Sequence, residues 1–215
     1  MSSNAPDDDA PSCEYIADTW RWKQDGARWL ASLTFPAGGD GATAKRWVAA
    51  TVAGLLEDFT PLARVRTAML LADEGPTSLT RKMGEPYALF RTRLLNAVGA
   101  HTRPLIEVNL ALDICVWVRT TDSPQRPKLA WISYPGIELG LHLEDEAWVN
   151  FSLDTTLFSA FTYPDMDPNP LYPLNQPQLE TSLRRLRARA AEPLDLAGEL
   201  PGTFEFGFSP DPDDY

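Results

Sequence analysis

Alternating apolar and polar positions predict a long strand in the middle of the chain. Over 105–119 every even-numbered residue is apolar, which is the period of a strand with one buried face. The odd-numbered positions are mixed and include Glu107, Asn109 and Asp113. Because successive side chains of a strand point to opposite faces, we expect these polar groups on the exposed side of a sheet.

Turn residues between alternating segments predict a first hairpin near the amino terminus. Asp25-Gly26 is a typical two-residue hairpin turn, and the residues on either side of it alternate in character over 16–35. Pairing across this turn places Trp22 opposite Trp29 on an apolar face. We therefore expect a half-buried antiparallel hairpin here.

A second hairpin is predicted farther along, where 137–143 and 147–153 alternate around the turn Glu144-Asp145-Glu146. In this register His142 and Trp148 face each other on the polar surface. Shorter strands are expected over 62–71 and 128–133, the latter ending before a turn at Pro135-Gly136.

Apolar residues at a spacing near 3.6 predict three helices. They cover about 43–59, 86–98 and 177–190, and the last places four apolar residues on one face, Leu179, Leu183, Leu186 and Ala190. Five prolines between 163 and 177 predict an extended, stiff loop before that helix.

This order of elements predicts an α+β fold, with a mainly antiparallel sheet of about six to seven strands and three helices packed on it. Regular strand–helix alternation and a glycine fingerprint, which a doubly wound nucleotide-binding fold needs, are both missing. We expect a single domain over 13–204, because domains typically run about 100–200 residues.

The charge is unevenly distributed. The chain has 19 Lys and Arg against 30 Asp and Glu, a formal net charge of −11. Acids without any base occupy 1–12 and 205–215, and the composition of both segments predicts solvated tails, disordered at the amino-terminal end. The stretch 129–183 also holds acids and no Lys or Arg, whereas 62–103 is rich in bases.

The acidic balance and the cysteine content limit the classes of partner and compartment. An acidic surface repels phosphate backbones and anionic lipids, so we expect neither nucleic acid nor a membrane as partner. The first residues have no positive segment followed by an apolar one, as a secretory signal would. Two cysteines, Cys13 and Cys115, form no disulfide framework, and we predict a cytoplasmic protein.

No catalytic, cofactor or metal motif is recognisable. The glycines at 38–41 lack the spacing of a phosphate loop, and the run from Asp165 has Pro170 and Gln176 where a calcium loop needs glycine and glutamate. His101 and His142 are far apart and belong to no zinc motif. We therefore predict no catalytic residue, no cofactor and no metal.

An enzyme remains the competing interpretation. Glu107 and Asp113 share one face of the predicted long strand, and His142 could join them from the following hairpin as a general acid–base group. The wet face of an antiparallel sheet carries such residues routinely, so this pattern also fits a protein without activity. An adaptor subunit of a larger complex is a third interpretation.

Aromatic residues among acids and prolines favour protein recognition. Rings supply buried contact area, while carboxylates supply complementarity to a basic partner. We expect a partner-binding surface within 138–172, formed by Glu138, His142, Glu144, Asp145, Glu146, Trp148, Tyr163, Asp165, Asp167 and Tyr172.

The chain resembles, in overall type, the immunity proteins that neutralise bacterial polymorphic toxins. The stretch Asn175-Gln176-Pro177-Gln178-Leu179-Glu180, leading into Leu183-Arg184-Arg185-Leu186, is similar to helix entries of such proteins. The resemblance implies a bacterial inhibitor that binds a cognate toxin domain stoichiometrically, without a cofactor. The partner would be a basic toxin domain.

Overall fold

A computed structural model describes residues 6–11, 26–36, 41–60, 62–120, 123–144, 146–162, 166–198 and 200–214. These residues form a seven-stranded antiparallel sheet and three α-helices, so the predicted α+β class is confirmed. The strands are β1 (Ala27–Leu33), β2 (Ala63–Ala72), β3 (Gly75–Thr80), β4 (Leu105–Thr120), β5 (Ser123–His142), β6 (Ala147–Leu153) and β7 (Asp195–Ala197). Their order across the sheet is β3-β2-β4-β5-β6-β1-β7.

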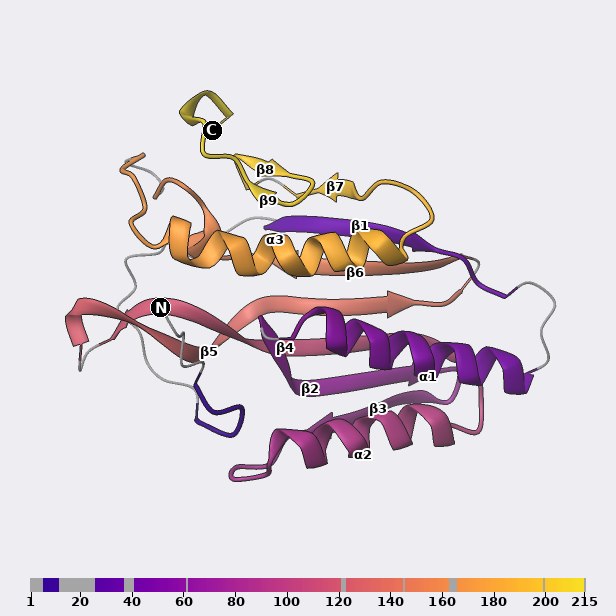
Figure 1. The fold of residues 1–215 in the computed structure, drawn as a ribbon. Helices are drawn as coiled ribbons and strands as arrows, with labels where there is room; N and C mark the ends of the chain where they lie inside the picture. The colour runs from indigo at the N-terminus through magenta and orange to yellow at the C-terminus, as the bar shows by residue number, and fades with distance from the viewer. Residues whose placement is uncertain are drawn as a thin grey trace.

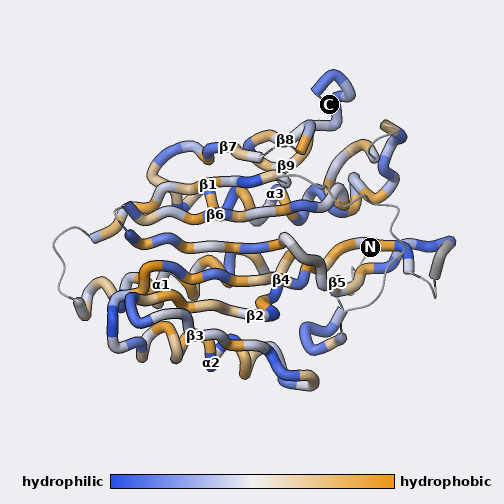
Figure 2. Tube along the Cα trace, turned by 180° about the vertical axis from the view of Figure 1, so that it is seen from behind, coloured by the Kyte–Doolittle hydropathy of each residue, from blue (hydrophilic) through white to orange (hydrophobic). Residues whose placement is uncertain are grey.

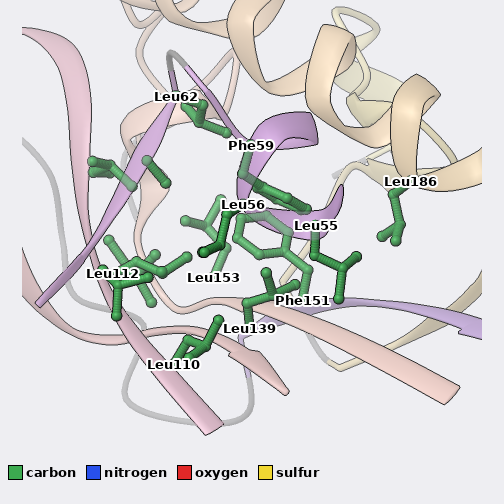
Figure 3. Close-up of a cluster of buried hydrophobic side chains, with 14 of the residues drawn as sticks. Leu55, Leu56, Phe59, Leu62, Leu110, Leu112, Leu139, Phe151, Leu153 and Leu186 are labelled. Atoms are coloured by element: carbon green, nitrogen blue, oxygen red, sulfur yellow. The ribbon is translucent and has the colours of Figure 1, made fainter. Parts of the chain in front are cut away.

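The helices α1 (Gly41–Asp58), α2 (Tyr87–Ala100) and α3 (Tyr172–Arg189) lie on the same face of the sheet (Figure 1). The apolar positions of β4 face them, as the alternation predicts, and Leu110 and Leu112 are at most 2% exposed. Phe59, the residue after α1, packs on Phe151 of β6 with ring centroids 4.7 Å apart, at the centre of the core in Figure 3. Each such fully buried side chain contributes about 1.5–3 kcal/mol.

The strand β5 is longer than predicted. The expected strand 128–133 and the first half of the second hairpin are one continuous element, which pairs along β4. Its register shifts between Ser133, which lies opposite Asp113, and Glu138, which lies opposite Ala111. Pro135-Gly136 thus forms an irregularity within a strand instead of a turn. Gly136 has φ 86°, and a Cβ there would meet the Asp154 carboxylate at 2.1 Å, so glycine fits this site where other residues would clash.

The strand β1 is the second half of the first predicted hairpin. Trp29 and Ala31 face the core as predicted, and both are 0% exposed. Trp29 lies opposite Phe151 of β6 on one side and Leu196 of β7 on the other, so both edges of β1 are occupied at this position. The predicted partner segment, 16–25, lies outside the described residues.

The helix α3 begins at Tyr172, earlier than the predicted start at Pro177, so the predicted proline-rich loop is wrong over its last residues. Pro173 is tolerated because the first turn of a helix needs no backbone N–H. Asn175 also holds this turn in place, because its side chain binds both backbone groups of Trp117.

The carboxyl-terminal segment packs on the domain, although its composition predicts a solvated tail. The strands β8 (Thr203–Phe204) and β9 (Gly207–Phe208) form a small hairpin, after which a single 3-10 turn covers Pro212–Asp214. Phe208 is 0% exposed and meets Trp29 edge to face at 6.0 Å. The Trp29 indole also donates a hydrogen bond to the carbonyl of Phe204 at 2.9 Å. Burial of aromatic rings outweighs the acidic composition here.

Candidate functional site on the open face of the sheet

The surface of the sheet turned away from the helices is seen from behind in Figure 2 and is called the open face here. Cross-strand pairing over β4, β5 and β6 places its central side chains in rows. Glu107, His142 and Trp148 form the first row, Asn109 and Asn150 flank Gly140 in the second, and Ala111, Glu138 and Ser152 form the third.

The first row is held together by direct contacts. His142 Nδ1 lies 3.2 Å from Glu107 Oε1, and Asn109 donates a hydrogen bond to the same oxygen at 2.9 Å. The His142 ring stacks on Trp148 with centroids 3.7 Å apart and planes 11° apart. A Cβ at Gly140 would lie 2.9 Å from the Asn109 side-chain oxygen, so glycine at this position leaves room for the cluster.

Burial governs the protonation of His142. Desolvation lowers the pKa of His142 below its usual 6.5, although Glu107 and Glu144 both act to raise it. The ring is therefore mainly neutral at pH 7. A neutral imidazole held between a carboxylate and an indole is a rigid recognition element and also has the composition of a general base.

The structure divides the predicted partner surface into two parts. Glu138, His142, Glu144, Glu146 and Trp148 lie on β5, on β6 or at the turn between them, and with Glu107 they form what we call the acidic patch.

Asp167 and Tyr172 instead lie near the start of α3, beyond the far end of β6, a strand about 20 Å long. The Tyr172 hydroxyl is engaged with the carbonyl of Phe208 at 2.9 Å, which indicates a structural role. Asp145, Tyr163 and Asp165 lie outside the described residues.

Asp113 does not join Glu107 and His142, so the predicted acid–base trio is not assembled. It is six residues from Glu107 along β4, a separation of about 20 Å. It is also only 5% exposed, and its carboxylate binds Arg64 Nε at 3.2 Å and the Ser133 hydroxyl at 2.5 Å. The carboxylate is committed to an internal ion pair.

Sequence reasoning missed the residues around Asp113. Arg64 is 2% exposed and its guanidinium lies over the Trp131 ring, 4.4 Å from the centroid. The excess of bases over 62–103 was a signal for a basic site, but it did not identify which arginines meet. Strand pairing brings Arg64 and Trp131 together from β2 and β5, across the intervening β4.

The surface depression next to the acidic patch is shallow and open to solvent. An open depression of about 390 Å³ lies on the open face, lined in part by Thr67, Met69 and Glu138. A more enclosed cavity of about 270 Å³ lies on the helix side, between α1 and α2, lined mainly by apolar groups and by His101.

Comparison with known proteins found no match among protein family models, curated proteins or solved structures. Among the described residues, no three or more His, Cys, Asp or Glu side chains gather in a way that could hold a metal ion. None of the described helices has the length and apolar character to cross a membrane.

Proposed function

We propose that this protein is a non-catalytic binding protein that recognises a basic protein partner through the acidic patch. The observation that carries the proposal is the stacked His142–Trp148 pair on the open face of the sheet, with Glu107, Glu138, Glu144 and Glu146 around it. Binding energy at protein interfaces concentrates on aromatic anchors, with charged groups around them.

The rigidity of this patch favours tight recognition. Glu107, His142 and Trp148 project from three adjacent strands and contact one another, so they lose little conformational freedom when a partner docks. Glu144 and Glu146 are exposed at the turn beside them. Exposed carboxylates accelerate association with a basic surface through electrostatic steering.

The finer assignment is an immunity protein, that is, a cytoplasmic bacterial inhibitor that neutralises a cognate toxin by stoichiometric binding. It is supported by the resemblance in overall type and by an acidic patch complementary to a basic toxin domain. Inhibition of this kind needs no cofactor, since occupation of the toxin's surface is sufficient.

The experiment screens the products of the two genes that flank this one for binding to the chain, and a basic, toxic product that binds serves as the partner. Association and dissociation rates are measured by stopped-flow fluorescence at several salt concentrations. The variant E144K/E146K should associate about tenfold more slowly at low salt and show a weaker salt dependence. The variant W148A should dissociate faster, with a loss of about 2 kcal/mol in binding free energy.

The matched control is D211K/D213K, which makes the same change in net charge at exposed positions near the carboxyl terminus, at the opposite end of the molecule from the patch in Figure 1. It should associate at nearly the wild-type rate. Equal slowing by both double variants would mean that net charge alone acts, and an unaffected E144K/E146K would exclude the patch.

The contact between Glu107 and His142 supports one alternative, an enzyme with a carboxylate–histidine pair on an open surface. Two single variants distinguish an enzyme from a binding protein. E107Q would abolish turnover of an enzyme, whereas W148A would remove the aromatic anchor of a binding protein. Release of product from a panel of ester, amide and phosphoester substrates by the wild type, lost in E107Q, would favour the enzyme.

A further inference from the structure

A basic site lies at the end of the open face away from the acidic patch. It consists of Arg64, Arg81, Trp131 and the first turn of α2, and we call it the arginine seat. Arg64 lies over the Trp131 ring, and the Arg81 guanidinium lies 5.7 Å from the centroid of the Tyr87 ring. Tyr87 is the first residue of α2, so the positive end of the helix dipole adjoins the seat.

The acidic segment 6–11 occupies this seat, and Figure 1 shows it in indigo beside the start of α2. Two successive main-chain carbonyls are bound. Trp131 Nε1 donates to the carbonyl of Asp7 at 3.0 Å, and Arg64 and Arg81 both donate to the carbonyl of Asp8.

A carboxylate completes the contact. Asp9 Oδ1 accepts a hydrogen bond from the Tyr87 backbone N–H at 2.5 Å and lies 3.4 Å from Arg81 Nη2. The segment is folded as a compact turn, because the backbone N–H of Asp9 donates to the Asp7 side chain and that of Ala10 donates to the Asp7 carbonyl. The seat therefore recognises both the shape and the charge of an acidic turn.

The seat has support of its own, independent of the segment. Arg64 Nε is held by Asp113, and Arg81 Nε donates to the carbonyl of Glu85 at 3.0 Å. Asp7, Asp8 and Asp9 are all exposed, in contrast to the buried Arg64. Removal of the segment would thus uncover a formed cationic surface without opening the core.

We propose that the arginine seat is a binding site for acidic peptide segments, and that residues 6–11 fill it as the chain's own competitor. A partner would be recognised by two main-chain carbonyls at Arg64, Arg81 and Trp131, followed by a carboxylate at the start of α2. This site requires an acidic ligand, the opposite of what the acidic patch requires, so its test is independent of the proposed function.

The test measures binding of a fluorescein-labelled peptide with the sequence of residues 4–12 to the full chain by fluorescence anisotropy. The variant D9K should release the segment, because it places an ammonium group against Arg81 and the positive end of α2. The peptide should bind D9K at least about tenfold more tightly than the wild type, since a tethered competitor acts at an effective concentration of about 1 mM.

The matched control is E192K, which makes the same charge change at an exposed position and should bind the peptide as weakly as the wild type does. A peptide with Asn in place of its three Asp residues should bind D9K at least about tenfold more weakly. Adding R81Q to D9K should abolish binding.

Three outcomes would overturn the proposal. The first is equal binding of the peptide to the wild type and D9K, or no binding to D9K at about 1 mM peptide. The second is binding that persists in D9K/R81Q. The third is a D9K chain that does not fold, judged by circular dichroism, because the segment would then be an integral part of the domain.

Discussion

His142 and Trp148 stack ring on ring across the pair β5 and β6, with centroids 3.7 Å apart, while Glu107 holds the imidazole from β4. Three neighbouring strands thus fix one aromatic surface. Because the imidazole is in contact with the indole, its protonation is readable in the fluorescence of Trp148.

We expect a fluorescence transition of Trp148 centred below pH 6.5, because burial lowers the pKa of His142. Imidazolium quenches an adjacent indole, so emission should fall as the pH is lowered. The measurement is the emission of the wild type minus that of W148F. This subtraction removes the contributions of the other tryptophans. A transition at or above pH 6.5 would contradict the effect of burial.

The same pKa shift affects folding stability. The folded pKa lies below the unfolded one, so the unfolded chain binds more protons between the two values. The contribution of His142 to the free energy of unfolding is therefore complete above about pH 6.5 and is lost as the pH falls through the folded pKa. Urea unfolding of the wild type and H142Q at a series of pH values should show this loss in the wild type alone.

Asn175 should be essential for stability. It is 0% exposed, accepts from the Trp117 N–H at 2.7 Å and donates to the carbonyls of Trp117 and Leu157. Asn175→Ala leaves buried backbone groups without a partner and should lower the free energy of unfolding by about 2 kcal/mol. The exposed Asn96 of α2 provides the control, since Asn96→Ala should change stability by less than about 0.5 kcal/mol. Equal effects of the two substitutions in urea unfolding would refute this assignment.

The ion pair between Asp58 and Arg189 joins the ends of α1 and α3. Asp58 is 8% exposed and binds both Nε and Nη2 of Arg189. A double-mutant cycle with D58N and R189M should give a coupling energy of about 1–3 kcal/mol, because the pair is bidentate and partly buried. The exposed pair of Glu180 and Arg184 on α3 should give less than about 1 kcal/mol in the same cycle. If the coupling energy of Asp58 and Arg189 is no larger than that of the exposed pair, partial burial does not strengthen this ion pair.

The alternation of apolar and polar residues correctly predicted the parts of the fold that depend only on residues close in sequence. The period of two placed Leu110 and Leu112 in the core and predicted that His142 and Trp148 face each other, as the structure confirms. Pro135-Gly136 was wrongly predicted as a turn because a bulge and a turn use the same residues, and only the pairing of β5 with β4 distinguishes them.

The site was harder to predict than the fold because it depends on neighbours that are distant in sequence. Glu107 contacts His142 because the two residues lie opposite each other on β4 and β5. Asp113, the predicted third member of this cluster, instead forms an ion pair with Arg64 of β2. Charge counting treated the acids of 138–172 as one surface, although β6 separates the two groups. Topology decides which charges become neighbours.

Cys115 should be inert to thiol reagents in the folded protein. It lies in the middle of β4, is 2% exposed, and burial raises its pKa to about 12. At pH 8 only about one thiol in ten thousand would be ionised, and the thiolate is the reactive form. In a C13S background, so that Cys115 is the only thiol, Ellman's reagent should label the folded chain at least about a thousandfold more slowly than the urea-unfolded chain. Labelling at similar rates in both states would contradict the burial of Cys115 and would mean that the cover over this part of β4 opens readily.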